Sequence, residues 1–225
     1  MIELRGIKKR YGAHLALDVP ELLFTPGERY ALIGPNGSGK TTLLRILAGT
    51  LKPDEGNVRF SGLERGEIGY MPQKPYAFEM SVVKNVMLSL GGGEDARKAA
   101  MAALERVGLL QLAKARGSRL SGGETQRMAL ARLIAKSHKA LLLDEPTASA
   151  DIYASDMAEQ ALLEYAAETG CTLIFSSHAP SQALRLGTRA VALDGGQICE
   201  HGTAADVLKN PKSECTKFFL SHWKL

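Results

Sequence analysis

The sequence predicts an α/β fold with a mostly parallel sheet, because short apolar runs alternate along the chain with segments of helical periodicity. Two of these runs, YALIG at 30–34 and KALLLDE at 139–145, have the length and flanking residues of buried strands. A glycine-rich loop at 34–42 leads from the first run into a segment of helical spacing. These three observations are typical of a sheet whose strands are connected by helices.

The N-terminal 30 residues are predicted to form strands and turns. IELRGIKKRY alternates weakly between apolar and polar residues, Gly12 interrupts it, and PGER at 26–29 is a turn signal. A short helix is expected at 40–49, where Gly49 is a natural C-terminal stop. The following segments GNVRFSG and EIGYMPQ predict two more short strands.

Residues 81–118 differ in character and predict an inserted helical subdomain. SVVKNVMLSL and DARKAAMAALERVGLLQLAKA are helical by period and by alanine content, and GGGED joins them. Helix is expected again at 124–138. We expect one domain over the whole chain, 1–225, with these approximate parts: an α/β core at 1–80 and 139–225, and a helical subdomain at 81–138.

The last third of the chain continues the alternation of helices and strands. The expected elements are a helix at 152–169, a strand at 171–177, a hairpin-like pair at 190–198 and a helix at 203–222. A parallel sheet of this kind collects ligand-binding side chains at the carboxyl ends of its strands.

Composition indicates an ordinary globular protein and argues against two functional classes. Hydrophobic residues make up 45% of the 225 residues and charged residues 23%. The net charge of +4 comes without a dense basic tract, so nucleic acid is not an expected partner. No apolar run approaches the roughly 18 residues that span a bilayer, so work at a membrane would require separate membrane subunits.

Cysteine and histidine residues give no disulfide or metal signal. Cys171, Cys199 and Cys215 are odd in number and form no CxxC, which favours a reduced cytosol over a disulfide framework. Four histidines without clustered partners are expected on the solvated surface: His14, His138, His201 and His222.

The loop GPNGSGKTT at 34–42 has the spacing of a phosphate-binding P-loop. Its glycines let backbone N–H groups approach phosphates, and the helix start adds the positive end of a helix dipole. We expect Lys40 to reach the phosphates as a point charge and Thr41 to hold Mg²⁺. A plain glycine-rich turn is the alternative, disfavoured by the strand before and the helix after. The phosphate-binding residues expected here are Gly34, Pro35, Asn36, Gly37, Ser38, Gly39, Lys40, Thr41 and Thr42.

Two acids end the apolar strand at 139–145. At the carboxyl end of a parallel strand, Asp144 can hold Mg²⁺ while Glu145 polarises an attacking water. The alternative is a solvated acidic loop, and the P-loop earlier in the chain disfavours this interpretation.

The stretch RLSGGETQR at 119–127 has the chemistry of a helix start that can hold an anion. Its glycines allow close backbone approach, and Ser121 offers a hydroxyl. The alternative is an ordinary helix start, with Ser121 as the cap and Glu124 completing a capping box. The two interpretations are compatible, and local chemistry does not identify the phosphate that would bind.

The set formed by GPNGSGKTT, Gln73, LSGGETQR, LLLDEPTASAD and His178 resembles the ATP-binding subunit of ABC transporters over nearly the entire chain. The LSGG stretch ahead of a strand-end Asp-Glu is the specific part, since many unrelated NTPases have a P-loop. The resemblance implies a P-loop NTPase core with a mostly parallel sheet, an N-terminal antiparallel β-subdomain and an inserted α-helical subdomain. It also implies an ATPase that uses ATP and Mg²⁺ to drive membrane transport, here expected to be solute import.

The resemblance further implies that two subunits, here expected to be identical, pair head to tail with ATP between them. Ser121, Gly122, Gly123 and Glu124 of one subunit would then bind the γ-phosphate held by the P-loop of the other. Separate transmembrane permease subunits and a solute-binding protein are the other implied partners. The implied location is the cytoplasmic face of the cell membrane.

Three further residues take their roles only from the resemblance. Tyr11 matches the aromatic side chain that stacks on adenine, with packing inside the β-subdomain as the alternative. Gln73 matches the glutamine that senses Mg²⁺ and the attacking water, and otherwise would be a polar loop residue. His178 matches the switch histidine at the γ-phosphate, and otherwise would be structural. The implied catalytic set is Glu145, His178, Lys40 and Gln73, and the implied Mg²⁺ set is Thr41, Gln73 and Asp144.

The sequence departs from the family pattern in the loop that follows Pro146. Ala148-Ser149-Ala150-Asp151 stands where Ser-Ala-Leu-Asp is usual, so we expect altered communication across the dimer with ATP binding retained. Glu124 stands where glutamine is commoner.

Residues 74–90 are expected to contact the membrane subunit, with Tyr76, Phe78 and Met80 as exposed apolar anchors and core packing as the alternative. The stretch YMPQKPYAFEMSVVKNV is most similar to ATPases of small-oxyanion uptake systems, tungstate first. The rival class is a non-transport ABC ATPase acting on nucleic acid or ribosomes. Such chains carry a long coiled coil or a second nucleotide-binding domain, and neither fits within 225 residues.

Overall fold

A six-stranded sheet forms the centre of the computed structural model, which describes residues 1–148 and 151–223. The strands lie in the order β5-β6-β7-β3-β8-β9, and every neighbouring pair is parallel except β8 with β9. Their bounds are β3 Arg29–Ile33, β5 Ile68–Met71, β6 Ala140–Asp144, β7 Thr172–Ser176, β8 Arg189–Asp194 and β9 Gln197–Thr203. The prediction of a mostly parallel sheet is confirmed.

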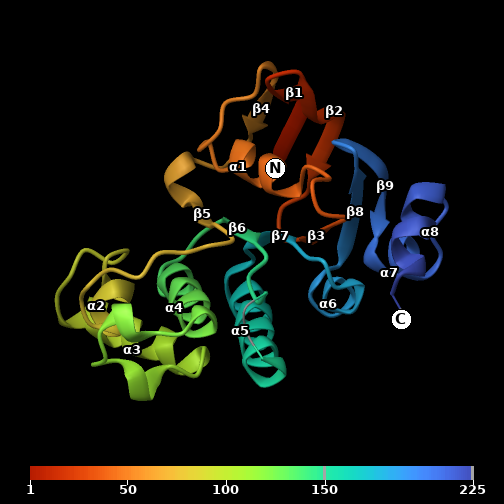
Figure 1. Ribbon diagram of the computed structural model, residues 1–225. Helices are drawn as coiled ribbons and strands as arrows, with labels where there is room; N and C mark the ends of the chain where they lie inside the picture. Colours follow the sequence, from red (N-terminus) through yellow and green to blue (C-terminus); the bar gives the residue numbers. More distant parts are fainter. Residues whose placement is uncertain (149–150, 224–225) are drawn as a thin grey trace.

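A second sheet, wholly antiparallel, is built from the N-terminal part of the chain. Its order is β2-β1-β4, with bounds β1 Ile2–Tyr11, β2 His14–Phe24 and β4 Glu55–Phe60. Figure 1 shows this sheet at one end of the molecule, with helix α1 (Lys40–Leu47) beneath it. The antiparallel N-terminal β-subdomain is therefore also confirmed.

The central strands are buried on both faces, because their side chains alternate between two apolar cores. Leu32, Leu142 and Ile174 pack with α1 and the antiparallel sheet. Leu143 and Phe175 point to the opposite face and pack with the helices there. Burial on both faces is why these strands are continuous apolar runs in the sequence.

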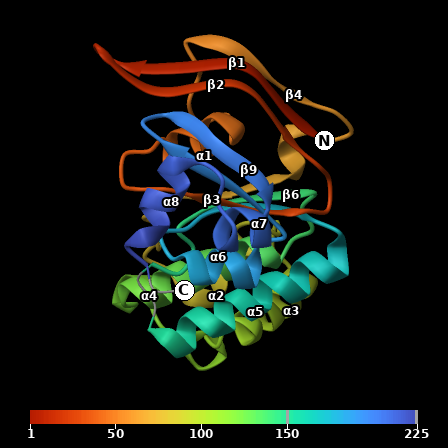
Figure 2. The ribbon, with the colours of Figure 1, turned by 90° about the vertical axis from the view of Figure 1, so that its right-hand side faces the viewer.

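The remaining helices cover the other face of the central sheet. Figures 1 and 2 show α2, α3 and α4 grouped together, with α5 and α6 between them and the C-terminal elements. None of the helices in the described part of the chain is long and apolar enough to cross a bilayer. Their bounds are α2 Val82–Met87, α3 Glu94–Arg106, α4 Gly122–Ile134, α5 Ile152–Thr169, α6 Pro180–Leu186, α7 Ala204–Lys209 and α8 Glu214–Ser221.

Two interpretations of the C-terminal region are wrong. The helix predicted at 203–222 is broken into α7 and α8, because Pro211 has no N–H to continue a helix. The cysteine count suggested no disulfide, yet Cys199 of β9 is bonded to Cys215 of α8. The disulfide attaches α8 to the edge strand β9. The third cysteine, Cys171, is free and buried, and burial raises the pKa of its thiol to about 12.

His138 is buried, which corrects its predicted place on the solvated surface. Burial and the nearby charge of Lys136 lower the pKa of its imidazole. The Tyr165 hydroxyl accepts from the backbone N–H of His138 at 2.7 Å and donates to the Lys136 carbonyl at 2.9 Å. The other three of the four histidines are exposed, as predicted: His14, His201 and His222.

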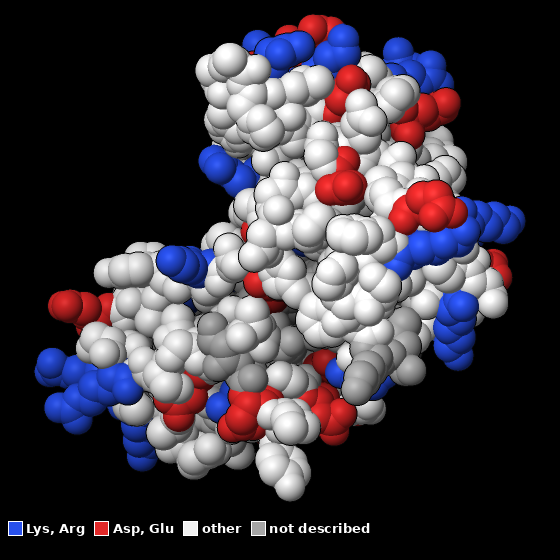
Figure 3. Space-filling model, turned by 45° about the vertical axis from the view of Figure 1, so that its right-hand side comes forward, with Lys and Arg blue, Asp and Glu red and all other residues white. Residues whose placement is uncertain are grey.

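Charged side chains are dispersed over the face of the molecule that Figure 3 shows. Lysine and arginine side chains are interspersed there with aspartate and glutamate, and uncharged residues cover much of its middle. The pattern on this face agrees with the modest net charge of +4.

Candidate active site

The glycine-rich loop leaves the end of β3 and enters α1 at Lys40. Gly34 has φ of 140°, and a Cβ atom there would lie 2.0 Å from the carbonyl oxygen of Leu193. Gly39 has φ of 102°, and its Cβ would lie 2.9 Å from the carbonyl oxygen of Ala16. Only glycine fits both the backbone angles and the space, so these two residues determine the path of the loop.

The Lys40 ammonium lies inside the loop that precedes it. Its Nζ donates to the carbonyl oxygens of Gly34 and Pro35, each at 2.8 Å, and to Ser38 Oγ at 3.3 Å. Burial lowers the pKa of this ammonium, while two carboxylates at the end of β6 act in the opposite direction. The loop thus holds a cation with only 5% of its residue surface exposed, at the place where the motif predicts phosphates.

Asp144 lies at the end of β6 and is paired with two hydroxyl groups. Thr41 Oγ1 donates to its Oδ1 atom at 3.1 Å, and Ser176 Oγ donates to the same atom at 2.7 Å. Its Oδ2 atom is buried and has no hydrogen-bond partner among the described residues. A hydroxyl beside a buried carboxylate oxygen with spare capacity is a donor set that hard divalent cations prefer, so these residues fit Mg²⁺.

Glu145 is held between Gln73 and His178. Gln73 Nε2 donates to its Oε2 atom at 3.0 Å, and His178 Nε2 contacts its Oε1 atom. Its φ is 52°, the left-handed region that non-glycine residues rarely adopt and that often marks functional sites. The structure therefore brings the carboxylate, amide and imidazole of the predicted catalytic set into direct contact.

A cavity of about 470 Å³ connects these side chains to the P-loop. Tyr11, 47% exposed, also lines it, and Lys9 Nζ lies 5.9 Å from the centroid of the Tyr11 ring. His14 and Ala16 line the cavity without having been predicted. The other predicted residues in its lining are Asn36, Gly37, Ser38, Gly39, Lys40, Thr41, Thr42, Gln73, Glu145 and His178.

The RLSGGETQR stretch lies elsewhere, at the start of α4, and is not part of this cavity. The Ser121 N–H and Oγ both donate to Glu124 Oε2 at 2.8 Å, and the Glu124 N–H donates back to Ser121 Oγ at 3.3 Å. The capping box is therefore present, and its hydrogen bonds lower the pKa of the Glu124 carboxyl. Ser121 and Gly122 are exposed, and Gly123 and Glu124 are half-buried, so the helix start is accessible from outside.

Two residues at the site were missed from the sequence. Ser176 donates to Asp144 and accepts from the Glu145 N–H at 2.9 Å, so it fixes both acids. Its place two residues before His178, at a strand end, was a usable signal. Gln126 of α4 donates to the carbonyl oxygens of Gln73 and Glu145, each at 3.4 Å, and no sequence pattern indicated this contact.

The altered loop is only partly described. Asp151 caps α5, because its side chain accepts from the Ala154 N–H at 2.8 Å. Of the three replaced positions, Ala148 donates its N–H to the Glu145 carbonyl at 3.3 Å, and Ser149 and Ala150 lie outside the described residues.

Comparisons with known proteins agree with this geometry. Residues 17–148 match the family model described as ABC transporter. The chain is 37% identical over 207 residues to the tungstate uptake system ATP-binding protein TupC of Peptoclostridium acidaminophilum, covering 88% of this chain and 97% of the relative. It is 38% identical over 235 residues to the sulfate/thiosulfate import ATP-binding protein CysA of Bradyrhizobium diazoefficiens, covering 97% of this chain and 68% of that one.

Two solved structures show the same architecture. The dimeric ATP-binding cassette MJ0796, in a post-hydrolysis state with ADP and Pi, has a TM-score of 0.82 and 28% identity, covering 91% of this chain and 99% of that one. The cbiO1 subunit of the cbiONQ transporter complex from Clostridium perfringens has a TM-score of 0.80 and 26% identity, covering 93% and 90%.

Proposed function

The chain belongs to the ABC transporter family, as an ATP-binding subunit, and we propose that it drives import of a small oxyanion. It is an ATPase that couples ATP hydrolysis to membrane transport. The named relatives act in tungstate uptake and in sulfate or thiosulfate import. The shared chemistry of these cargoes, a compact oxyanion, supports the substrate class, and the 97% coverage of the tungstate relative supports tungstate first.

The observation that carries the catalytic assignment is the placement of Glu145 at the P-loop cavity. Its carboxylate contacts both Gln73 and His178, and all three line the cavity with Lys40. In the proposed mechanism Glu145 accepts a proton from the attacking water, which Gln73 helps to position. His178 and Lys40 donate to the γ-phosphate as its charge is redistributed in the transition state.

Thr41 and Asp144 would hold Mg²⁺, with Gln73 beside them. The buried Oδ2 atom of Asp144, which lacks a partner among the described residues, supports this assignment. When bound there, Mg²⁺ would neutralise charge on the nucleotide phosphates.

We infer that ATP is bound between two copies paired head to tail. The start of α4 supports this arrangement, because it is an exposed, capped helix end that does not line its own chain's nucleotide cavity. Ser121, Gly122, Gly123 and Glu124 would complete the partner's site through the helix N-terminus. Tyr11 would stack on the adenine at the open side of the cavity.

The segment at 74–90 is the proposed contact for transmembrane permease subunits. Tyr76 is 66% exposed and Phe78 42%, and their rings pack edge to face with centroids 5.0 Å apart. Met80 is half-buried, so it was wrongly predicted as an exposed anchor. We place the subunit at the cytoplasmic face of the membrane, with a solute-binding protein delivering the cargo outside. The helices of 81–138 would move as the unit that carries this contact.

Replacing Glu145 by glutamine tests the catalytic assignment. Glu145→Gln should bind ATP yet hydrolyse it about 10² to 10⁴ times more slowly, because the general base is lost, and it should accumulate as a dimer. The matched control is Glu164→Gln, an exposed carboxylate on α5, which should turn over normally. Normal hydrolysis by a monomeric Glu145→Gln chain would show that the assignment is wrong.

Mixing two variants tests the shared site. In a mixed dimer of Lys40→Ala and Ser121→Ala, one interface keeps both unchanged halves and the other loses both. Partial hydrolysis in the mixture, with much less in either variant alone, is the expected result. Absence of ATP-dependent pairing in every combination would contradict the proposed arrangement, and DNA-stimulated hydrolysis would favour the rival class instead.

A further inference from the structure

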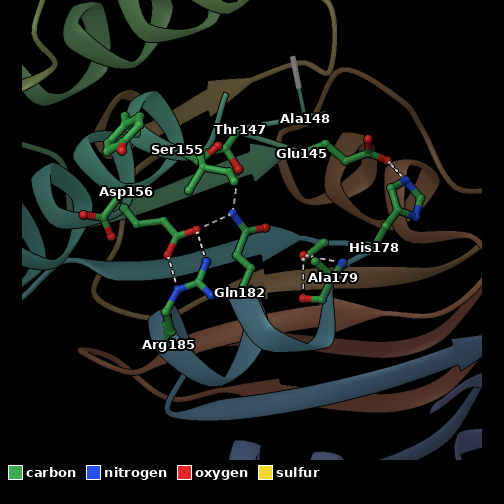
Figure 4. A pocket seen from close by; sticks show the side chains of 13 residues that line it. Glu145, Thr147, Ala148, Ser155, Asp156, His178, Ala179, Gln182 and Arg185 are labelled. Atoms are coloured by element: carbon green, nitrogen blue, oxygen red, sulfur yellow. Dashed lines mark hydrogen bonds and ion pairs between the residues drawn. The ribbon is translucent and has the colours of Figure 1, made fainter. Parts of the chain in front are cut away.

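A second cavity, of about 660 Å³, lies beside Glu145 and His178 and has a buried carboxylate in its wall. That carboxylate belongs to Glu159 of α5, which is 4% exposed. Figure 4 shows Gln182 and Arg185 of α6 at this wall of the cavity, with Gln182 also reaching Thr147 of the loop that follows Glu145. None of the roles proposed above uses these side chains.

Glu159 is held by three hydrogen bonds from α6. Arg185 Nη2 donates to its Oε1 atom and Arg185 Nε to its Oε2 atom, both at 2.8 Å. Gln182 Nε2 donates to Oε1 at 3.0 Å. A buried carboxylate needs such compensation, and a bidentate guanidinium contact also fixes orientation, so α6 is held rigidly against α5.

Gln182 continues the chain of contacts to the catalytic loop. Its Nε2 atom also donates to Thr147 Oγ1 at 2.6 Å, and Thr147 lies two residues after Glu145. Gln182 is 7% exposed, so one buried amide links α5, α6 and the loop. Because a primary amide has two N–H donors, both are accounted for by these two contacts.

This chain of contacts links the two chain segments that carry Glu145 and His178, the residues that meet at the proposed catalytic centre. α6 begins at Pro180, directly after the His178 segment, and has only seven residues. A helix this short has little stability alone, so its orientation depends on packing and on Glu159. At the other end, Glu145 has a backbone conformation that its surroundings must hold in place.

We propose that Glu159 and Gln182 are positioning residues that fix the Glu145 loop relative to His178, and so set the rate of hydrolysis rather than the affinity for ATP. This rests on the proposed roles of Glu145 and His178. The contacts of Lys40 and the P-loop do not involve Glu159 or Gln182, so ATP binding should be spared. A misplaced catalytic group, in contrast, lowers turnover.

The test exchanges the carboxylate and the amide in the full chain. Glu159→Gln leaves Arg185 facing N–H donors, and Gln182→Glu places two carboxylates together. Each should lower kcat for ATP by about 5- to 100-fold with KM changed by less than about twofold. The double variant restores one carboxylate facing one amide, and the Thr147 hydroxyl can donate to the new carboxylate. It should recover kcat to within about threefold of the unchanged chain.

Three results would overturn the proposal. They are single variants with kcat unchanged, a loss that appears in KM instead, and a loss of kcat that the double variant does not recover. Thr147→Val keeps the size of the side chain but removes the hydroxyl that accepts from Gln182. It is the replacement test if Glu159→Gln does not fold. It should lower kcat by about fivefold with KM unchanged, and an unchanged kcat would again refute the proposal. Glu164→Gln, the exposed control on α5, should have no effect.

Glu145→Gln separates this inference from the proposed function. If Glu145→Gln hydrolyses ATP normally, the catalytic assignment fails and the positioning role fails with it. If Glu145→Gln is inactive while the exchange variants have normal kcat, only the positioning role fails.

Discussion

Replacing Glu124 by glutamine should tighten ATP-dependent pairing of two chains while leaving the cap of α4 in place. Glutamine can still accept from the Ser121 N–H, so the capping box survives. What disappears is a carboxylate that accepts from both the N–H and the hydroxyl of Ser121 at 2.8 Å. In the proposed dimer these are groups that the partner's γ-phosphate would contact, so the carboxylate and the phosphate compete for the same donors.

The magnitude follows from the charges and their exposure. Two like unit charges at 4 Å repel by about 1 kcal/mol in water and by about 4 kcal/mol at an effective dielectric constant of 20. Glu124 is only half-buried, so the lower value applies. We therefore expect about fivefold tighter binding per site. Loss of a negative charge at the helix start should cost about 0.5 kcal/mol of stability in α4.

Sedimentation in the Glu145→Gln background, where hydrolysis does not remove ATP, measures the effect. The dissociation constant of the ATP-bound dimer should fall for Glu124→Gln and stay the same for the control Glu164→Gln. Equal or weaker pairing of Glu124→Gln would refute the competition between carboxylate and phosphate. A large fall in melting temperature would show instead that the cap had failed.

Three further predictions concern stability. Cys199→Ser should lower the free energy of unfolding by about 3 kcal/mol, because the disulfide spans a sequence separation of 16 residues. Denaturant unfolding with and without a reducing agent measures this effect. Equal unfolding midpoints for the unchanged chain in the two conditions would contradict it. Tyr165→Phe should cost about 1 to 3 kcal/mol, because its hydroxyl is the partner of the His138 N–H and the Lys136 carbonyl; a change below about 0.5 kcal/mol would mean that other groups replace it. Because the pKa of Glu124 is lowered in the folded chain, its carboxylate contributes to the free energy of unfolding above pH 4.5, its ordinary pKa. This contribution is lost as the pH falls through the lower pKa of the folded state. Glu124→Gln should therefore lose less stability than the unchanged chain on acidification.

Local sequence patterns are informative where neighbouring residues act together. The P-loop was evident because its glycines, lysine and threonine are adjacent, and the structure shows why glycine is needed at Gly34 and Gly39. The predicted helix at 152–169 agrees with α5 residue for residue, because an aspartate cap precedes it and a glycine ends it. Asp144 and Glu145 lie at the strand end where a parallel sheet places its ligand groups.

Features that depend on tertiary contacts could not be predicted. The disulfide joins cysteines from a strand and a helix, and its spacing of 16 residues matches no motif. The buried His138 donates its backbone N–H to the hydroxyl of Tyr165, which lies 27 positions away. The contacts of Glu159 with Gln182 and Arg185 likewise join different helices. Pro211 is a sequence signal for the break before α8, and the helix predicted at 203–222 did not take it into account.

Through Gln126, α4 connects its exposed N-terminus to the loop that carries Glu145. Ser121 at the helix start and Gln126 are separated by five residues, or about 7.5 Å of helix rise. Gln126 donates to the backbone carbonyls of both Gln73 and Glu145, so one helix connects the surface proposed to meet a partner's nucleotide to the carboxylate proposed to act in catalysis. In the proposed symmetric pair, a shift of α4 on contact with the partner's ATP would therefore move Gln126 and, through its hydrogen bond, the backbone of Glu145.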